Sequence, residues 1–372
     1  MNFKINKKEF LEALNITSKA ISSTTPLPAL SGIKFELTGN ELTLISSDSN
    51  ISIKVVINNS DSEIITIEEP GEIVIEAKYI LDIVRKIDSS SINIEVIDGT
   101  LVRIYGGNSE FKLNCIKASD YPMINFSTSD NIFKLDSSIF KDIINQTAFA
   151  CSDKEIKPVL TGINFQAGNG KLRVNATDSL RLATKTLVIE DGIEFNITIP
   201  AKYLLNVYHS IDENIKEINM MVDTQKVSFS FNNILIQTRL LDDAFPEVSK
   251  LIPPSFTQKL LVNSKELSSA IDRSSFIKSD GKNIVKLNIN SENIEVTSSN
   301  QNSSSFENIK VISFEGEPIN ISCSGNYLQD AIKALDSENI TISFSGELKP
   351  MILTNSEDTS IVQLIAPIRT YR

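Results

Sequence analysis

The sequence predicts an α+β protein made of three copies of one domain, each with two helices packed on antiparallel sheet. Three observations carry this prediction. Similar segments recur along the chain at a nearly constant spacing. Each copy alternates helical and strand periodicities in the same order. Prolines and small polar residues interrupt these periodicities near 123–131 and 249–258, which divides the chain into domains at 1–124, 125–251 and 252–372.

The clearest repeated segment is an amphipathic helix with apolar residues at helical spacing. Its copies are EAKYILDIVRKI at 76–87, PAKYLLNVYHSI at 200–211 and SGNYLQDAIKAL at 324–335. The tyrosines of these segments, Tyr79, Tyr203 and Tyr327, lie 124 residues apart, and three such repeats account for all 372 residues. Repetition at a fixed period indicates that one structural unit has been copied.

Each copy begins with a short strand that runs into another helix. The copies are FKINKKEFLEAL at 3–14, FKLDSSIFKDII at 133–144 and LLVNSKELSSAI at 260–271. Asn6, Asp136 and Asn263 stand where a side-chain oxygen is expected to cap the helix. Glu9 and Glu266 follow three residues later, in the position of a capping-box partner.

Paired strands follow the first helix of each copy, and further alternating runs follow the second helix. The pairs are 30–37 with 42–49, 160–167 with 172–179, and 284–289 with 294–300; the later runs are 92–97, 226–231 and 340–345. GNGK at 168–171 predicts a type I′ or II′ turn between strands. The first two copies close on SDYP at 119–122 and DAFP at 243–246. Each copy is therefore an α+β unit.

Composition neither supports nor excludes nucleic-acid binding. The net charge of −11 differs from the basic balance typical of phosphate-binding domains, but a local basic face can coexist with an acidic exterior. Cys115, Cys151 and Cys323 are isolated and the chain has one histidine, so no zinc site is expected. The start of the chain lacks the apolar core of a signal peptide and no stretch is long enough to span a membrane, which favours the cytoplasm.

Residues for catalysis are scarce. His209 lies inside a helical segment, where a solvated or structural role is favoured because acid–base work needs a positioned partner. No phosphate-binding loop, nucleophile elbow or H-E-x-x-H helix occurs. Asp48 and Asp178 recur at equivalent positions, either as a metal-binding pair or as turn residues at strand ends, and we favour the turn. The sequence predicts no cofactor, no metal and no enzymatic activity.

Specific motifs in this layout resemble a known family. ATDSLRLA at 176–183, DDAFPEVSKLIP at 242–253 and IAPIRTY at 365–371 are similar to segments of the beta subunit of bacterial DNA polymerase III, the sliding clamp. The resemblance covers the entire chain in the right order. It implies three clamp domains per chain and a six-domain ring, formed as a head-to-tail homodimer, that encircles double-stranded DNA. It implies a non-enzymatic DNA sliding clamp that confers processivity on the replicative polymerase and is loaded by an ATP-driven clamp loader.

The same resemblance implies a pocket for short linear peptides. Its partners would be the DNA polymerase III alpha subunit, the clamp loader delta subunit, other polymerases and repair proteins. The implied pocket residues are Leu160, Thr177, Leu180, Arg181, Leu182, Pro246, Lys250, Leu251, Tyr327, Leu348, Pro350, Leu364, Ile365, Pro367, Ile368 and Arg369. Taken singly, Leu180, Leu182 and Ile365 could equally be ordinary strand residues. Ser179 and Leu180 replace a frequent Gly-His of the family, and the effect of the last residues, Thr370–Arg372, is open.

The resemblance also implies a modestly basic inner surface that contacts phosphates without reading bases. The candidates are Lys78, Arg85, Lys86, Lys154, Lys202 and Lys333, with Lys7, Lys8, Lys141, Lys265 and Arg273 on the first helices. Thr24 stands where relatives have an arginine, so the DNA contact at this position is in doubt.

A junction between two chains is the last implied feature. Phe111 and Leu113 would meet Phe276 and Ile277 of a second copy, although all four could be core residues of their own domains. Two other hypotheses stay open. One is an interaction scaffold of the same triplicated domain that does not encircle DNA, and the other is an enzyme of unknown type.

Overall fold

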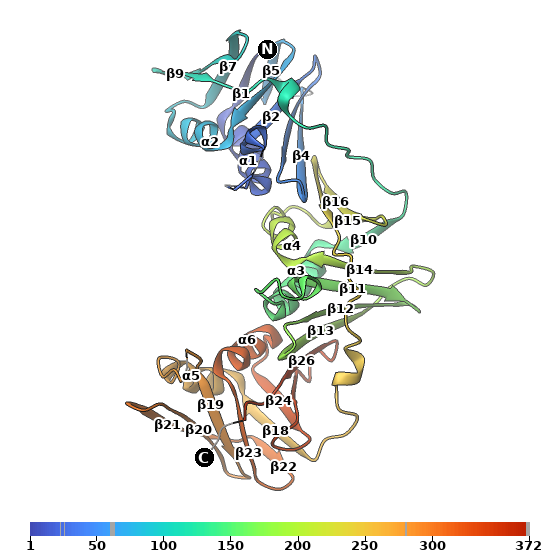
Figure 1. The fold of residues 1–372 in the computed structure, drawn as a ribbon, viewed down its shortest axis with the longest axis vertical. Coiled ribbons are helices and arrows are strands. Elements are labelled where there is room, and N and C mark those ends of the chain that lie inside the picture. Colours follow the sequence, from blue (N-terminus) through green and yellow to red (C-terminus); the bar gives the residue numbers. More distant parts are fainter. Residues whose placement is uncertain (23, 26, 60–63, 280, 370–372) are drawn as a thin grey trace. The chain divides into compact units, whose positions relative to one another are not determined.

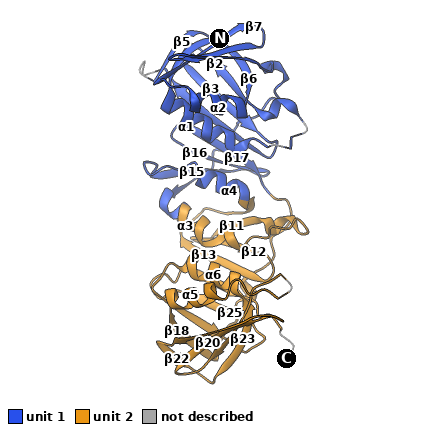
Figure 2. Ribbon diagram, turned by 90° about the vertical axis from the view of Figure 1, so that its left-hand side faces the viewer, with its two compact units in different colours: residues 1–140, 202–240 blue, residues 141–201, 241–372 orange. Residues whose placement is uncertain are grey.

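The computed structural model describes residues 1–22, 24–25, 27–59, 64–279 and 281–369. They form two compact units, one of residues 1–140 and 202–240 and the other of residues 141–201 and 241–372 (Figure 2). Each unit is described by itself. No helix in the described ranges has both the length and the apolar character needed to cross a bilayer.

The first unit contains two antiparallel sheets (Figure 1). The five-stranded sheet has the order β5 (Ile65–Glu69), β1 (Asn2–Asn6), β7 (Ser91–Asp98), β8 (Leu101–Gly106), β9 (Ser109–Asn114). The eight-stranded sheet has the order β10 (Ile132–Asp136), β15 (Glu217–Val222), β16 (Lys226–Phe231), β17 (Ile234–Arg239), β4 (Ile51–Asn58), β3 (Glu41–Ser47), β2 (Gly32–Leu37), β6 (Gly71–Glu76). The helices are α1 (Lys7–Thr17), α2 (Ala77–Lys86) and most of α4 (Ala201–Tyr208), with short helices η1 (Ser18–Ala20), η2 (Pro28–Ser31) and η3 (Ala118–Asp120).

The second unit also contains two antiparallel sheets. The nine-stranded sheet has the order β14 (Phe195–Pro200), β11 (Gly162–Gly168), β12 (Lys171–Thr177), β13 (Arg181–Val188), β26 (Ile361–Ile365), β25 (Met351–Thr354), β24 (Asn339–Phe344), β18 (Gln258–Asn263), β22 (Ser313–Glu315). The four-stranded sheet has the order β21 (Ser304–Lys310), β20 (Asn293–Ser299), β19 (Ile284–Ile289), β23 (Ile319–Ser324). The helices are α5 (Ser264–Arg273) and α6 (Gly325–Leu335), with η4 (Ala148–Ala150), η5 (Pro158–Thr161) and η6 (Ser249–Leu251); α3 (Ser137–Thr147) begins in the first unit and ends in the second.

The predicted α+β repeat is confirmed, with two α-helices in each copy. The cap predictions are also confirmed: Asn6, Asp136 and Asn263 each accept a backbone N–H from the first turn of the following helix. The capping box at Glu9 is wrong. The N–H of Asn6 donates to the carbonyl of Ile64 at 2.7 Å, because the cap residue is also the end of a strand. Asn169 and Gly170 both have positive φ, so GNGK forms a type I′ turn.

Two of the four sheets are built from strands of different repeats. In the first unit, β4 of the first repeat pairs with β17 of the second. In the second unit, β13 of the second repeat pairs with β26 of the third. Pairing gives each of these strands a hydrogen-bonded neighbour on a side that would otherwise be a sheet edge. Backbone hydrogen bonding therefore holds neighbouring repeats together.

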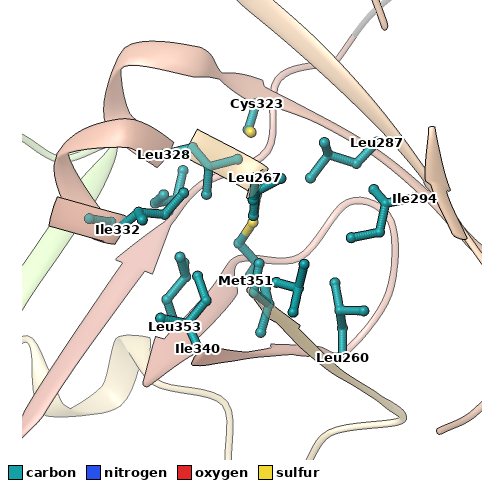
Figure 3. Close-up of a cluster of buried hydrophobic side chains, with 14 of the residues drawn as sticks. Leu260, Leu267, Leu287, Ile294, Cys323, Leu328, Ile332, Ile340, Met351 and Leu353 are labelled. Atoms are coloured by element: carbon teal, nitrogen blue, oxygen red, sulfur yellow. The ribbon is translucent and has the colours of Figure 1, made fainter. Parts of the chain in front are cut away.

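The third repeat shows how a core forms between two sheets. α5 and α6 contribute Leu267, Leu328 and Ile332, which pack against residues of both sheets of the second unit (Figure 3). Met351 of the nine-stranded sheet and Leu287 of the four-stranded sheet belong to the same cluster, and all of it is buried. Removal of this apolar surface from water stabilises the domain.

We expect Leu328→Ala to destabilise the second unit by about 3 kcal/mol, because truncation leaves a cavity among fully buried neighbours. Urea unfolding followed by circular dichroism measures the change. Asn326→Ala is the control, since Asn326 lies on the same helix and is exposed. Equal unfolding midpoints for the two variants would contradict the assignment of Leu328 to the core.

Candidate functional site

The candidate site is built on the turn between β12 and β13. The Oδ1 atom of Asp178 accepts the backbone N–H groups of Leu180 and Arg181 at 2.8 and 3.0 Å. The hydroxyl of Thr177 accepts the N–H of Ser179 at 3.1 Å, and Ser179 has a φ of 79°. This tight turn leaves the side chain of Leu180 54% exposed.

The same turn occurs one repeat earlier, at Asp48. Its Oδ1 atom accepts the N–H groups of Asn50 and Ile51 at 2.9 and 2.8 Å. The prediction that Asp48 and Asp178 are turn residues is therefore confirmed. Nowhere in the described ranges do three or more His, Cys, Asp or Glu side chains gather closely enough to hold a metal ion.

Arg181 connects the turn to α6. Its Nε donates to Asp178 at 3.1 Å and its Nη1 donates to Asp330 at 2.7 Å. The guanidinium also lies over the ring of Tyr327, 4.2 Å from the centroid. Two carboxylates and a ring thus hold the cation, so Arg181 positions the surrounding residues and is not a free charge.

Tyr327 completes this polar cluster. Burial raises the pKa of its hydroxyl to about 12, and a hydrogen bond with Asp178 raises the pKa as well. Tyr327 is therefore neutral at physiological pH. Its ring lies between α6 and the turn that carries Leu180.

The end of the chain runs beside the turn. Strand β26 pairs with β13 so that Ile365 lies opposite Arg181 and Leu364 opposite Leu182. The N–H of Ala366 then donates to the carbonyl of Leu180 at 2.8 Å. The tail residues Pro367 and Ile368 follow and are half-buried. The structure thereby brings the 177–182 segment and the tail into contact, as the implied pocket requires.

A hydrophobic cluster covers the other side of this strand pair. Leu182 and Leu364 pack with Val248 and Ile352, and all four are buried. A hollow of about 420 Å³ borders the cluster and is lined by Leu182, Val248, Ile252 and Val362, among others. Sequence reasoning missed Val248, although it lies two residues after Pro246 in the motif DDAFPEVSKLIP.

The remaining implied pocket residues differ in exposure. Leu251 and Leu348 are exposed apolar side chains, and Pro246, Lys250 and Arg369 are exposed too. Pro350 is half-buried and precedes β25, whose Met351 lies opposite Ile365. Leu160, Thr177, Leu182, Leu364 and Ile365 are buried. The implied pocket residues therefore range from fully buried to exposed, and buried Leu182 lines the hollow beside Val248. Thr370–Arg372 lie outside the described residues.

The implied DNA-contacting cations lie on the second helices and on one loop. In the first unit these are Lys78, Arg85, Lys86 and Lys202, and in the second unit Lys154 and Lys333; all six are exposed. In the described part of the chain none of the six forms an ion pair with a carboxylate. Arg85 donates to the side-chain oxygen of Asn15 on α1 at 2.9 Å.

Two candidates on the first helices are engaged within the chain. The ammonium group of Lys7 donates to the carbonyl of Ile87 at 2.6 Å, and Arg273 pairs with Glu307 at 2.7 Å. Lys8, Lys141 and Lys265 form no ion pair with the residues that the structure describes. Thr24 is exposed.

The implied junction residues lie on an edge strand and in the segment after α5. Phe111 and Leu113 belong to β9, the edge strand of the five-stranded sheet. Phe276 follows α5 and is 73% exposed, whereas Ile277 is 1% exposed and already covered by its own chain. Phe306, on the edge strand β21, is a further exposed aromatic residue that sequence reasoning missed.

His209 and the cysteines show no feature of a reactive site. His209 is exposed and its ring lies edge-on to Tyr208 at 5.0 Å. Burial raises the pKa of Cys115 to about 11 and the pKa values of Cys151 and Cys323 to about 12. These thiols are therefore protonated at neutral pH and are poor nucleophiles.

Family models match the chain in three consecutive segments. They describe the N-terminal domain of the DNA polymerase III beta subunit over residues 1–125, the central domain over 134–247 and the C-terminal domain over 249–369. Among curated proteins, the beta sliding clamp of Bacillus subtilis is 36% identical over 378 residues, covering 100% of both chains. The beta sliding clamp of Staphylococcus aureus is 34% identical over 376 residues, again with 100% coverage.

Solved structures agree with these matches. The DNA polymerase sliding clamp of Bacillus subtilis has a TM-score of 0.95 and 36% identity, covering 100% of both chains. The beta chain of DNA polymerase III from Streptococcus pneumoniae has a TM-score of 0.95 and 31% identity, covering 99% of this chain and 100% of the other.

We expect Arg181→Met to lower the free energy of unfolding of the second unit by about 2 kcal/mol, because Asp178 and Asp330 lose their shared cation. Urea denaturation at neutral pH measures the difference. Arg173→Met is the matched control, since Arg173 lies on the neighbouring strand and is exposed. An unchanged midpoint for Arg181→Met would show that the cluster contributes nothing to stability.

Proposed function

The chain belongs to the DNA polymerase III beta subunit family, and from this premise we propose how it works as a sliding clamp. Family membership makes it a processivity factor that acts in DNA replication with DNA and DNA polymerase, and not an enzyme. The particulars that follow are our proposal: two copies close head to tail into a six-domain ring around duplex DNA.

Two unpaired sheet edges support the ring. Within the described residues, β9 ends the five-stranded sheet and β21 ends the four-stranded sheet. Exposed strand edges invite pairing, and a head-to-tail dimer would pair β9 of each copy with β21 of the other. Phe111, Leu113 and Phe276 would add apolar contact there, with Ile277 supporting Phe276 from beneath.

Unpaired cations on the second helices support a DNA-facing surface. Lys78, Lys202 and Lys333 occupy α2, α4 and α6, one in each repeat; Arg85 and Lys86 also lie on α2, and Lys154 lies in the loop between η4 and η5. Exposed ammonium groups without carboxylate partners can contact phosphates weakly through water. A closed ring cannot leave circular DNA by dissociation, so weak contacts suffice and allow sliding. The net charge of −11 is compatible with such a local surface.

The turn and tail support a groove for partner peptides. Exposed Leu180 and half-buried Pro367 and Ile368 flank a backbone contact between Leu180 and Ala366. Arg181 and Tyr327 hold this arrangement rigid, which lowers the entropic cost of binding. An apolar groove of this kind suits an extended segment with hydrophobic anchors. We propose that the polymerase alpha subunit, the clamp loader delta subunit and other polymerases and repair proteins bind here.

The proposal has two further parts. The clamp domains are residues 1–124, 125–251 and 252–372, so the second domain contributes to both compact units. The chain works in the cytoplasm, with the DNA that it would encircle.

A topological assay tests the ring. The protein is loaded onto nicked circular DNA with the clamp loader and ATP, and the circle is then linearised. We expect the protein to stay with the circle through gel filtration and to be lost once the DNA has ends, because only the closed circle prevents sliding off.

Retention on linear DNA, or failure to load, would contradict the ring. The scaffold hypothesis predicts no loading, and the enzyme hypothesis predicts no dependence on DNA topology. The mass in solution is a simpler check, since a stable monomer of 41.2 kDa would exclude a two-chain ring.

A surface variant tests the groove. We expect Leu180→Asp to weaken binding of the polymerase alpha subunit at least about tenfold, because the charge replaces an exposed apolar anchor. Surface plasmon resonance measures the affinity, and retention on circular DNA should not change. Val188→Asp, at the far end of the strand that follows Leu180 and also exposed, is the control. Equal affinities for both variants would place the partner elsewhere.

A further inference from the structure

A tyrosine–aspartate contact recurs where two repeats share a sheet. At the junction of β4 with β17, the hydroxyl of Tyr203 donates to the Oδ2 atom of Asp48 at 3.1 Å. At the junction of β13 with β26, the ring of Tyr327 lies 4.2 Å from the Arg181 guanidinium, which Asp178 binds at 3.1 Å, so the helix tyrosine again lies at the turn aspartate. Both tyrosines occupy the same position of the repeated second helix. In both cases the helix of one repeat contacts the strand-end turn of the repeat before it.

The two junctions also share their strand register. The N–H of Arg239 donates to the carbonyl of Asn50 at 2.9 Å, and the N–H of Ala366 donates to the carbonyl of Leu180 at 2.8 Å. Asn50 and Leu180 each lie two residues after the turn aspartate. The contact is therefore a repeated structural device and not a coincidence of one interface.

The tyrosine of the first repeat and the turn residue of the third repeat do not contact each other in this way within one chain. Tyr79 is the first-repeat tyrosine and is 50% exposed, whereas Tyr203 is 5% exposed. In the described part of the chain, no hydrogen bond involves the Tyr79 hydroxyl. The third-repeat turn residue is Asn300, whose Oδ1 accepts the N–H groups of Asn302 and Ser303 at 2.9 and 2.8 Å. This is the same turn that Asp48 and Asp178 form.

Two of the sheets likewise lack strands from a neighbouring repeat. The eight-stranded sheet joins four strands of the first repeat to four of the second, and the nine-stranded sheet joins four of the second to five of the third. The five-stranded sheet of the first repeat and the four-stranded sheet of the third remain separate. Together they would make another nine-stranded sheet, with β9 and β21 as its central pair.

We propose that Tyr79 of one copy and Asn300 of a second copy form the third tyrosine–turn contact, at the junction where β9 pairs with β21. This inference rests on the two-chain ring proposed above. The repeated register places Lys112 of one copy opposite Ser304 of the other, and directs the N–H of Asn114 to the carbonyl of Asn302.

The chemistry of this contact differs from that of the two internal ones. The Nδ2 atom of Asn300 donates one N–H to the carbonyl of Lys278 at 3.2 Å and has a second N–H to give. It would therefore donate to the Tyr79 oxygen, whereas Tyr203 donates to a carboxylate. A neutral amide–hydroxyl bond is weaker than a hydrogen bond to an ionised group.

The difference has a functional consequence. At the internal junctions the two repeats belong to one chain, and the turn residue is an aspartate. At the junction between copies the turn residue is the neutral Asn300. The tyrosine contact between copies would therefore contribute less to its junction than the Tyr203–Asp48 contact does to its own.

A double-mutant cycle on the full-length protein tests the contact. We expect Tyr79→Phe to raise the dimer Kd about tenfold, because one neutral bond is lost at each of two junctions and each bond contributes about threefold. Asn300→Ala should raise the Kd at least as much, since it also removes the side-chain contacts with Asn302, Ser303 and Lys278. The double variant should be no weaker than Asn300→Ala alone, since Tyr79→Phe then has no bond left to remove. Subunit exchange and sedimentation measure the Kd.

Two controls separate this contact from general effects. Tyr203→Phe removes the equivalent hydroxyl at an internal junction, and Asn302→Ala removes an exposed side chain from the same turn as Asn300; both should leave the dimer Kd unchanged. A wild-type Kd for both test variants, or single effects that multiply to about a hundredfold, would overturn the contact and leave the ring intact. A monomeric wild-type protein would overturn the ring and this inference with it.

Discussion

Strand pairing between repeats is the constraint on which the rest of the structure depends. Each repeat has a strand at one side, β4, β13 or β21, and a strand at the other, β9, β17 or β26. Backbone N–H and C=O groups at such edges need partners, and in two cases the next repeat supplies them. Three repeats in one chain satisfy two such junctions and leave β9 and β21 at sheet edges within the described residues, which the proposed second copy would pair.

The strand-end turns give these junctions their specificity. Asp48 caps its own turn with one oxygen, and its second oxygen accepts the hydroxyl of Tyr203 on the helix of the next repeat. At Asp178 the same oxygen also holds Arg181, whose other end reaches Asp330 on α6. The polar contacts that join the second and third repeats thus also support the turn on which the proposed partner groove is built.

The proposed ring would reconcile the acidic composition with DNA binding. A protein that depended on tight phosphate contacts would need a strongly basic surface and would slide poorly. A closed ring would require only that its inner helices are not repelled, and the exposed cations of α2, α4 and α6 would meet that need. The proposed binding of partners would rely on a different property, the exposed leucines and the turn beside the tail.

The sequence by itself determined the triplication, the order of helices and strands, the helix caps and the strand-end turns. These features depend on residues close together in the chain, and Asn6, Asp178 and the 124-residue spacing of the tyrosines display them directly. Only the tertiary structure decided which strands pair across repeats and that Asp330 binds Arg181. It also decided that Ile277 and Leu182 are buried while Leu180 is exposed, and that Val248 packs on the pair formed by β13 and β26. Those outcomes depend on contacts between segments about 60 to 180 residues apart. Local periodicity can assign an apolar residue to a strand, but it cannot show whether another repeat covers that residue.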